Sequence, residues 1–246
     1  MHIAILLASH TNKAMTRRFG DYHDMFKVLF QSLPNGQNFR LTTLAVVGDI
    51  FPNHPDDYEG YLMLCSAYCI YNDALCIARL IDLIQQIHEA RKPLFGVCFG
   101  HQIIARTLGD CAQKWYKRMV LGSIEVTLTN LPSWIAEKDF IVAKNVTINL
   151  IHVHQDQVTK LPEGAVRIGA ARDCENAVLI IGDRVFAIPG HPVFEIPYTN
   201  ALLSLLKDWA GKSHVRAARK LLSKPHDGRR LASWILAFFS RHKTTH

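Results

Sequence analysis

The sequence predicts an α/β fold in which a mostly parallel sheet lies between two layers of helices. Short apolar runs alternate with stretches of helical periodicity through residues 1–109. This β-α-β alternation is typical of a parallel sheet covered by helices on both faces. After Gly109 the chain becomes rich in strand-like runs. We therefore expect antiparallel strands at one edge of the sheet.

The elements of residues 1–109 follow from the spacing of apolar side chains. Strands are expected where the apolar runs are short: Ile3–Ala8, Arg40–Val47, Tyr61–Cys65 and Leu94–Val97. Helices are expected where apolar residues recur every three or four positions: Arg17–Leu33, Asn72–Ala90 and Gly100–Leu108. Each expected helix lies between two of the expected strands, which gives the β-α-β alternation.

The later part of the chain is expected to complete the sheet and to add helices. Predicted strands are Ser123–Leu128, Thr147–Val153, Val166–Ala170, Val178–Ile181 and Arg184–Ile188. Predicted helices are Tyr198–Trp209, Val215–Leu222 and Arg229–Phe239. The last two are amphipathic and are separated by a turn with the sequence Pro-His-Asp-Gly. We therefore expect one domain over residues 1–210 and a helical C-terminal extension over residues 211–246.

Composition excludes several classes of protein. The 246 residues are 49% hydrophobic and 20% charged, unlike a disordered or collagen-like chain. No apolar run approaches the ~20 residues of a membrane span, so no transmembrane segment is expected. The first eight residues lack a basic segment and resemble a strand more than a signal peptide. Six cysteines without paired spacing indicate reduced thiols, and we expect a cytoplasmic protein.

The net charge of +7 is concentrated in the C-terminal extension, which holds nine Lys or Arg residues and one acid, Asp227. The extension contains no recognisable nucleic-acid motif, so we interpret it as a solvated helix face and expect no nucleic-acid partner. The apolar run Trp234–Phe239 is expected to pack on the rest of the chain or on a second copy. These helices are therefore a candidate homo-oligomer surface, and adhesion to a membrane is the alternative.

The most informative segment is Gly96-Val97-Cys98-Phe99-Gly100, between a predicted strand and a predicted helix. Gly-x-Cys-x-Gly is the thiol counterpart of the hydrolase nucleophile elbow. The glycines permit the close backbone approach that such a turn requires. The helix N-terminus favours the Cys98 thiolate, and the Phe99 N–H is placed to bind an oxyanion. A buried cysteine in an ordinary turn explains the spacing equally well.

A cysteine nucleophile needs a base that later protonates the leaving amine. His191 is the best placed of the 13 histidines, because it follows the predicted strand Arg184–Ile188 and sites in open α/β sheets form at strand ends. His152 and His154 alternate on one strand and are a weaker candidate for half of a metal site. There is no glycine-rich phosphate loop, so nothing indicates ATP or a dinucleotide and we expect no cofactor. We expect no metal, because zinc needs further Cys or His ligands at matching depth.

Five segments of the chain resemble class I glutamine amidotransferases, whose Cys-His-Glu triad hydrolyses a γ-glutamyl amide. The elbow through Gln102 and the Gly190-His191-Pro192 loop carry most of the resemblance. Further matches are Tyr22–Phe26, Tyr58–Tyr61 and His154–Val158. The likeness runs from about residue 1 to 208. It is strongest to free-standing proteins related to the amidotransferase domain of GMP synthase, including γ-glutamyl peptidases.

The resemblance implies a flavodoxin-like three-layer sandwich and assigns roles to residues. Cys98 is implied as the nucleophile and His191 as the general base and acid. The N–H groups of Phe99 and Cys65 are implied as oxyanion donors. Contacts to the substrate are implied for the matching polar residues His101, Gln102, His154 and Gln155.

The sequence departs from the family pattern at two places near this site. The family's triad carboxylate lies two residues after the histidine, where this chain has Val193. Valine accepts no hydrogen bond, so our hypothesis is that Glu195 takes the role. The loop after the third strand, glycine-rich in the family, contains Cys65 here, and the family's later tryptophan is Cys76. These changes indicate a substrate other than plain glutamine.

The predicted function is therefore hydrolysis of a γ-glutamyl or related amide, in a small molecule or peptide, through a thioester on Cys98. Two alternatives stay open. One is a repurposed enzyme that uses Cys98 for acyl transfer or thiol chemistry in specialised metabolism. The other is a binding or regulatory subunit that keeps the fold with a degenerate triad.

Overall fold

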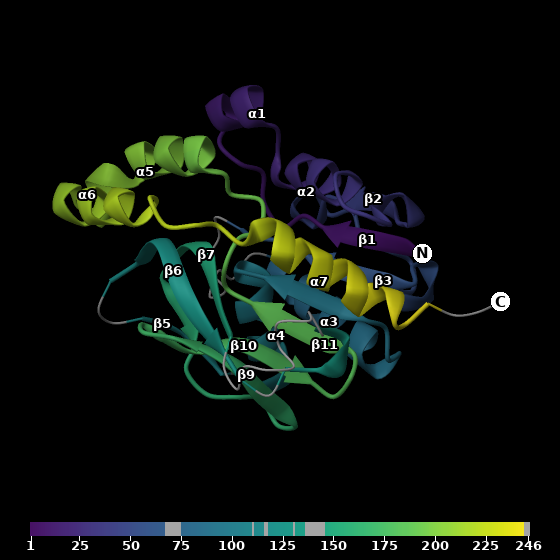
Figure 1. Cartoon of the computed structure of the whole chain (residues 1–246). Coiled ribbons are helices and arrows are strands. Elements are labelled where there is room, and N and C mark those ends of the chain that lie inside the picture. Colours follow the sequence, from purple (N-terminus) through teal and green to yellow (C-terminus); the bar gives the residue numbers. More distant parts are fainter. Residues whose placement is uncertain (67–74, 110, 116–117, 130, 136–145, 244–246) are drawn as a thin grey trace.

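A computed structural model of the chain describes residues 1–66, 75–109, 111–115, 118–129, 131–135 and 146–243. These residues form a large central sheet with helices on both faces (Figure 1). The strand order across the sheet is β2-β1-β3-β4-β11-β10-β9-β6-β7. The α/β three-layer sandwich predicted from the sequence is confirmed.

The strands of the central sheet divide into a parallel half and an antiparallel half. The parallel half consists of β1 (His2–Leu6), β2 (Arg40–Leu44), β3 (Gly60–Met63), β4 (Leu94–Val97) and β11 (Val185–Ile188). The antiparallel half consists of β6 (Val120–Leu128), β7 (Val146–His154), β9 (Ala165–Ala171) and β10 (Cys174–Ile181). The antiparallel strands lie at one edge, as the change of pattern after Gly109 predicts.

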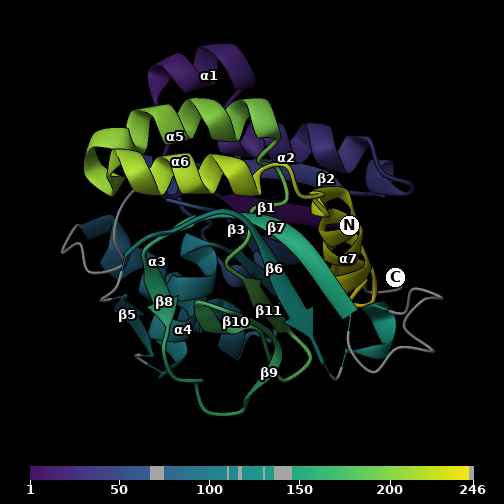
Figure 2. The ribbon, with the colours of Figure 1, turned by 60° about the vertical axis from the view of Figure 1, so that its left-hand side comes forward.

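Alternate residues of the parallel strands enter two separate apolar clusters, one on each face of the sheet. One face is covered by α3 (Leu75–Glu89) and α4 (Phe99–Gly109). The other face carries α2 (Tyr22–Gln31), α5 (Ile196–Ala210), α6 (Lys212–Leu221) and α7 (Gly228–Ser240). Figure 2 shows α7 on the side of the sheet away from α3 and α4. Both faces of β1, β3, β4 and β11 are therefore buried, as their almost wholly apolar sequences require. The edge strand β2 contains Arg40 and two threonines and is only partly buried.

One predicted helix is two helices in the structure. The prediction for residues 17–33 is wrong because the chain forms α1 (Lys13–Phe19) and α2, separated at Gly20. Gly20 has a φ of 81° and ends α1. Asp21 then begins α2 with a capping box, in which its side chain and that of Asp24 accept backbone N–H groups reciprocally. The periodicity of apolar residues continues across this break and hides it.

A short ladder lies outside the main sheet. Strands β5 (Ala112–Lys114) and β8 (Asp156–Val158) pair antiparallel and were not predicted. Three residues are too few for a visible alternation of polar and apolar side chains. The ladder brings Lys114 opposite Asp156, and both residues reach the site described below.

The C-terminal helices pack on the rest of the chain. Helix α6 lies against β6, with Val215 and Ala218 buried. Helix α7 buries Trp234 and Phe238, and the Phe238 ring lies 5.9 Å from that of Phe95 on β4. The apolar run in α7 thus covers the sheet, one of the two outcomes expected for it. Among the described residues, no helix combines the length and the apolar character needed to cross a membrane.

Candidate active site

Cys98 occupies a sharp turn between β4 and α4. Its φ of 55° places a non-glycine residue in the left-handed region, which costs free energy and is found mainly where function requires it. The Cys98 N–H donates to the carbonyl of Ile188 at 2.9 Å and so ties the turn to the end of β11. The predicted nucleophile elbow is present in the backbone.

Close packing explains the two glycines of the elbow. A Cβ built on Gly96 lies 2.6 Å from Ile104 Cδ1 and 2.7 Å from the carbonyl of Gly100. A Cβ built on Gly100 lies 2.4 Å from the Met63 carbonyl oxygen at the end of β3. Any side chain at these positions therefore forces α4 away from the sheet and displaces Cys98.

A cavity of about 260 Å³ opens beside Cys98. Cys98 and His191 both line it, although 93 positions separate them in the sequence. The other polar lining residues are Tyr22, Cys65, Ser66, Gln102, Lys114, His154, Gln155 and Asp156. The apolar lining residues are Met119, Val153, Phe194, Leu202, Leu206 and Trp209. The fold thus brings the predicted nucleophile and base to one cavity.

His191 is held through its backbone and its ring face. Its N–H donates to the carbonyl of Ile151 on β7 at 2.8 Å. Its imidazole stacks on the ring of Phe194, with centroids 3.8 Å apart and planes 5° apart. Both ring nitrogens are buried and make no hydrogen bond. The ring is therefore positioned by packing, with its nitrogens available for proton transfer.

Burial keeps the Cys98 thiol and the His191 imidazole neutral at pH 7. It raises the pKa of Cys98 to about 12 and outweighs the hydrogen bond from the Phe99 N–H, which favours the thiolate. It lowers the pKa of His191 to about 3, with the neighbouring His154 and His226 acting in the same direction. The expectation of a resting thiolate at Cys98 is therefore not met, because desolvation exceeds the effect of the helix N-terminus.

A second pair of histidines adjoins the site. His154 Nδ1 donates to the Asp156 carbonyl at 3.1 Å, so in the neutral ring its Nε2 is an acceptor. His152 Nδ1 donates to that Nε2 at 3.0 Å. His152 Nε2 is left as a buried acceptor without a partner, and it lies 3.1 Å from a Cβ built on Gly190. Two successive hydrogen bonds thus connect His152, His154 and the Asp156 carbonyl next to the His191 loop.

His152 and His154 bond to each other and not to a metal site. Within the part of the chain that the structure describes, no group of three or more His, Cys, Asp or Glu residues is arranged to hold a metal ion. Burial lowers the pKa of His154 to about 4 and that of His152 well below its ordinary value. Both rings are neutral at pH 7.

The structure brings together most of the residues singled out in the sequence. Gln102 lines the cavity and donates from Nε2 to the Asp156 carbonyl at 2.6 Å. Cys65, His154 and Gln155 line it as well. The Phe99 N–H donates a hydrogen bond toward the Cys98 sulfur. Cys69, one of the six cysteines expected to be reduced thiols, lies outside the described residues.

Two residues singled out in the sequence lie elsewhere. His101 is fully buried and does not line the cavity, and its Nε2 donates to the Asn176 carbonyl at 3.0 Å. Glu195 is exposed and lines a different cavity, of about 450 Å³, together with Val193. Neither side chain lines the cavity of Cys98 and His191.

Comparison with known proteins decides the family. The sequence pattern of the family described as "Glutamine amidotransferase class-I" matches residues 69–196, which include the elbow and the His191 loop. The chain belongs to the class I glutamine amidotransferase family. The resemblance inferred from the sequence is confirmed, and with it the kind of fold.

Relatives of this amidotransferase-family chain include free-standing proteins of similar length. Gamma-glutamyl peptidase 3 of Arabidopsis thaliana is 28% identical over 78% of this chain and 76% of its own length. A glutamine amidotransferase-like protein of Schizosaccharomyces pombe is 28% identical over 96% of this chain and 98% of its own. The solved structure of a glutamine amidotransferase from Thermotoga maritima covers 98% of this chain and is itself covered over 97%, with a TM-score of 0.71 at 16% identity.

One wall of the site in this family member was not predicted. Leu202, Leu206 and Trp209 from α5 form an apolar side of the cavity, and Lys114 lies on its lining with them. Leu202, Leu206 and Trp209 recur at helical spacing, and Trp209 is 63% exposed. In the structure, an exposed tryptophan at the end of an apolar stripe indicates a binding wall. The sequence alone does not show which cavity the stripe faces.

Proposed function

We propose that the chain hydrolyses γ-glutamyl amides in a small molecule or peptide, with Cys98 as the nucleophile and His191 as the general base and acid. The observation that carries this proposal is the shared cavity, which holds a cysteine at a strained elbow and a histidine whose ring nitrogens have no other partner. Relatives named gamma-glutamyl peptidase support the substrate class. The need for a reduced thiol suits a cytoplasmic setting.

The proposed reaction begins from the neutral pair. His191 accepts the Cys98 thiol proton as Sγ attacks the amide carbonyl, so charge develops only in the transition state. The N–H groups of Phe99 and Cys65 stabilise the oxyanion of the tetrahedral intermediate. The C–N bond then breaks, His191 delivers its proton to the departing amine, and a thioester remains.

Hydrolysis of the thioester restores the enzyme. His191 accepts a proton from water as the oxygen attacks the thioester carbonyl. The C–S bond breaks, the proton returns to the Cys98 sulfur, and the γ-glutamyl acid leaves. We assign no carboxylate an orienting role, because neither ring nitrogen of His191 has a hydrogen-bond partner. Val193 stands at the family's carboxylate position, and Glu195 lines another cavity. We therefore expect slow turnover compared with an intact triad.

The test is hydrolysis of L-γ-glutamyl p-nitroanilide, glutathione and glutamine by the full chain and by Cys98→Ala. Cys174→Ala is the matched control, because burial also raises the pKa of Cys174 to about 12 and Cys174 lies on β10 away from the cavity. We expect Cys98→Ala to abolish turnover of a γ-glutamyl substrate and Cys174→Ala to retain it. Equal turnover by wild type and Cys98→Ala contradicts the proposal.

The missing carboxylate also favours a second candidate, a subunit that binds without hydrolysis. A γ-glutamyl chloromethyl ketone distinguishes the outcomes by mass spectrometry of the Cys98 peptide. Labelling together with turnover supports the hydrolase. Labelling without turnover of any γ-glutamyl amide favours acyl-transfer or thiol chemistry on another substrate. Absence of labelling favours the binding subunit.

A further inference from the structure

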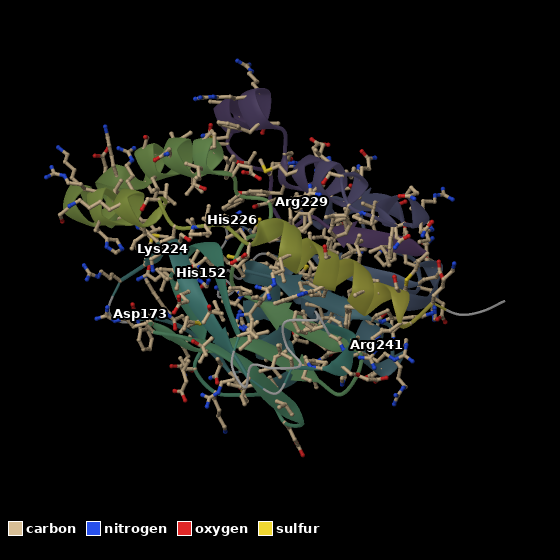
Figure 3. The ribbon with its side chains drawn as sticks, viewed as in Figure 1. His152, Asp173, Lys224, His226, Arg229 and Arg241 are labelled. Carbon is tan, nitrogen blue, oxygen red and sulfur yellow. The ribbon has the colours of Figure 1, made fainter. Side chains whose placement is uncertain are left out.

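The His191 loop is held from both sides along its backbone. On one side the His191 N–H donates to Ile151 of β7 at 2.8 Å. On the other side the His191 carbonyl accepts a hydrogen bond from Nε2 of His226 at 3.0 Å. His226 comes from the segment Pro225–Gly228, which we call the strap and which follows α6 and ends at the first residue of α7 (Figure 3). A residue of the C-terminal extension therefore contacts the backbone of the proposed base.

The strap is anchored on the same strand that anchors His191. The Asp227 N–H donates to the Asn149 carbonyl at 2.8 Å, and the Asn149 N–H donates to Asp227 Oδ2 at 2.7 Å. Asn149 lies two residues before Ile151 on β7. This reciprocal pair fixes the strap to β7, so the strap and the His191 loop share one rigid support.

The strap also packs closely against the residue after His191. A Cβ built on Gly228 lies 2.1 Å from the Pro192 carbonyl oxygen, so only glycine fits there. Two successive carbonyls, those of His191 and Pro192, thus face the strap. Pro192 has no N–H, so it offers the loop no backbone donor of its own. The hydrogen bond from His226 therefore fixes the orientation of the peptide group between His191 and Pro192.

The protonation of His226 follows from its partner. A carbonyl oxygen only accepts, so Nε2 carries the hydrogen. Glu195 and Asp227 are the carboxylates that act on His226, and partial burial opposes their effect and lowers its pKa. The neutral Nε2–H tautomer is therefore the donor at pH 7.

We propose that His226 is a positioning residue for His191, and that the strap Pro225–Gly228 replaces through the backbone the orientation that a triad carboxylate gives through the ring. The proposal rests on the proposed function. The strap lies beyond residues 69–196, which match the family. The two ring nitrogens of His191 have no partner, so the placement of the imidazole depends on where the backbone sets its Cα–Cβ bond and on the Phe194 ring.

The variants separate positioning from general stability. His226→Leu removes the donor, and His226→Gln supplies a side-chain N–H in its place. The matched control is His242→Leu, because His242 Nε2 donates to the Asp183 carbonyl at 2.9 Å beyond the other end of α7. His226→Leu and His242→Leu each remove one histidine-to-carbonyl hydrogen bond from the C-terminal extension, but only His226 touches the His191 loop.

The first readout is steady-state hydrolysis of L-γ-glutamyl p-nitroanilide. We expect His226→Leu to lower kcat at least tenfold with KM changed less than twofold, because proton transfer depends on the placement of His191. His226→Gln is expected to recover kcat to within threefold of wild type, and His242→Leu to keep wild-type values. Equal kcat for His226→Leu and wild type overturns the proposal, as does the same loss of kcat in His242→Leu.

The second readout does not need activity. Hydrogen exchange of the His191 amide, measured in the peptide that contains it, reports whether the loop opens. We expect exchange at least tenfold faster in His226→Leu and unchanged in His242→Leu. Unchanged exchange in His226→Leu overturns the proposal. If wild type hydrolyses no γ-glutamyl amide but hydrogen exchange changes as expected, the proposed function is wrong and the positioning of the His191 loop by the strap is supported.

Discussion

The imidazole of His191 lies flat on the ring of Phe194, with 3.8 Å between centroids and 5° between planes. Phe194 is 2% exposed and its ring also lies 4.6 Å from that of Tyr198 on α5. The stack therefore connects the proposed base to the apolar cluster beneath α5. It restrains the His191 ring in a chain that has Val193 where the family has a carboxylate.

Replacement of Phe194 by leucine tests this restraint. Phe194→Leu is expected to lower kcat by about tenfold, equivalent to about 1.4 kcal/mol, because an aromatic pair contributes roughly 0.5–1.5 kcal/mol beyond its area. Phe238→Leu is the control, since Phe238 is equally buried but lies on α7. We expect both variants to lose comparable stability in urea denaturation. A similar fall in kcat in both contradicts a specific role for the stack.

The buried histidines predict a loss of stability in mild acid. Burial lowers the pKa values of His101, His152, His154 and His191 in the folded protein. The unfolded chain, with histidine pKa values near 6.5, therefore binds more protons below that pH than the folded chain does. The free energy of unfolding is therefore highest above about pH 6.5 and falls as the pH decreases toward about 4. Each histidine contributes a fall of up to about 1.4 kcal/mol per pH unit.

Urea denaturation at pH 7.5 and pH 5.0 measures this effect. We expect the free energy of unfolding to fall by at least about 3 kcal/mol between the two. His101→Gln is expected to reduce that difference, because His101 is fully buried and lies outside the cavity. His54→Gln, at an exposed position, is expected to leave it unchanged. Equal stability at both pH values shows that the histidines are not held neutral.

The raised pKa of Cys98, about 12, predicts slow alkylation at neutral pH. Only the thiolate reacts, so the rate of Cys98 modification by iodoacetamide is expected to rise about tenfold per pH unit from pH 7 to 9. Mass spectrometry of the Cys98 peptide measures it, with the half-buried Cys76 as an internal reference. Rapid alkylation at pH 6 identifies a resting thiolate and contradicts the neutral pair.

The close packing of α4 against β3 predicts that one added methyl group at Gly100 destabilises the fold. Gly100→Ala places a Cβ 2.4 Å from the Met63 carbonyl oxygen and is expected to destabilise the protein by about 2 kcal/mol or more. Gly48→Ala is the control, because a Cβ at Gly48 meets nothing within 4 Å. Thermal unfolding measures both. A change for Gly100→Ala as small as that for Gly48→Ala contradicts the close approach.

Local patterns predicted the parallel core and the elbow. Leu94–Val97 and Gly-x-Cys-x-Gly are each specified by neighbouring residues, so the strand, the turn and the helix that follows are visible in the sequence. His191 was identifiable because it directly follows a predicted strand. The break at Gly20 was missed because apolar residues keep their helical spacing across it.

Contacts between distant segments could not be predicted. Nothing near Leu206 or Trp209 shows that α5 forms a wall of the Cys98 cavity. The hydrogen bond from His226 to His191 spans 35 positions and depends on how α6 and α7 return across the sheet. The failure of Glu195 to reach the cavity likewise depends on the direction in which the chain leaves His191 to begin α5.

Trp209 borders the Cys98 cavity and is at the same time 63% exposed. Trp234, by contrast, is 3% exposed within the core. Indole emission shifts to shorter wavelength when water is displaced from around it. Occupation of the cavity should therefore be visible as a change in the protein's own fluorescence and in its quenching by acrylamide, before any product forms and without a chromogenic substrate.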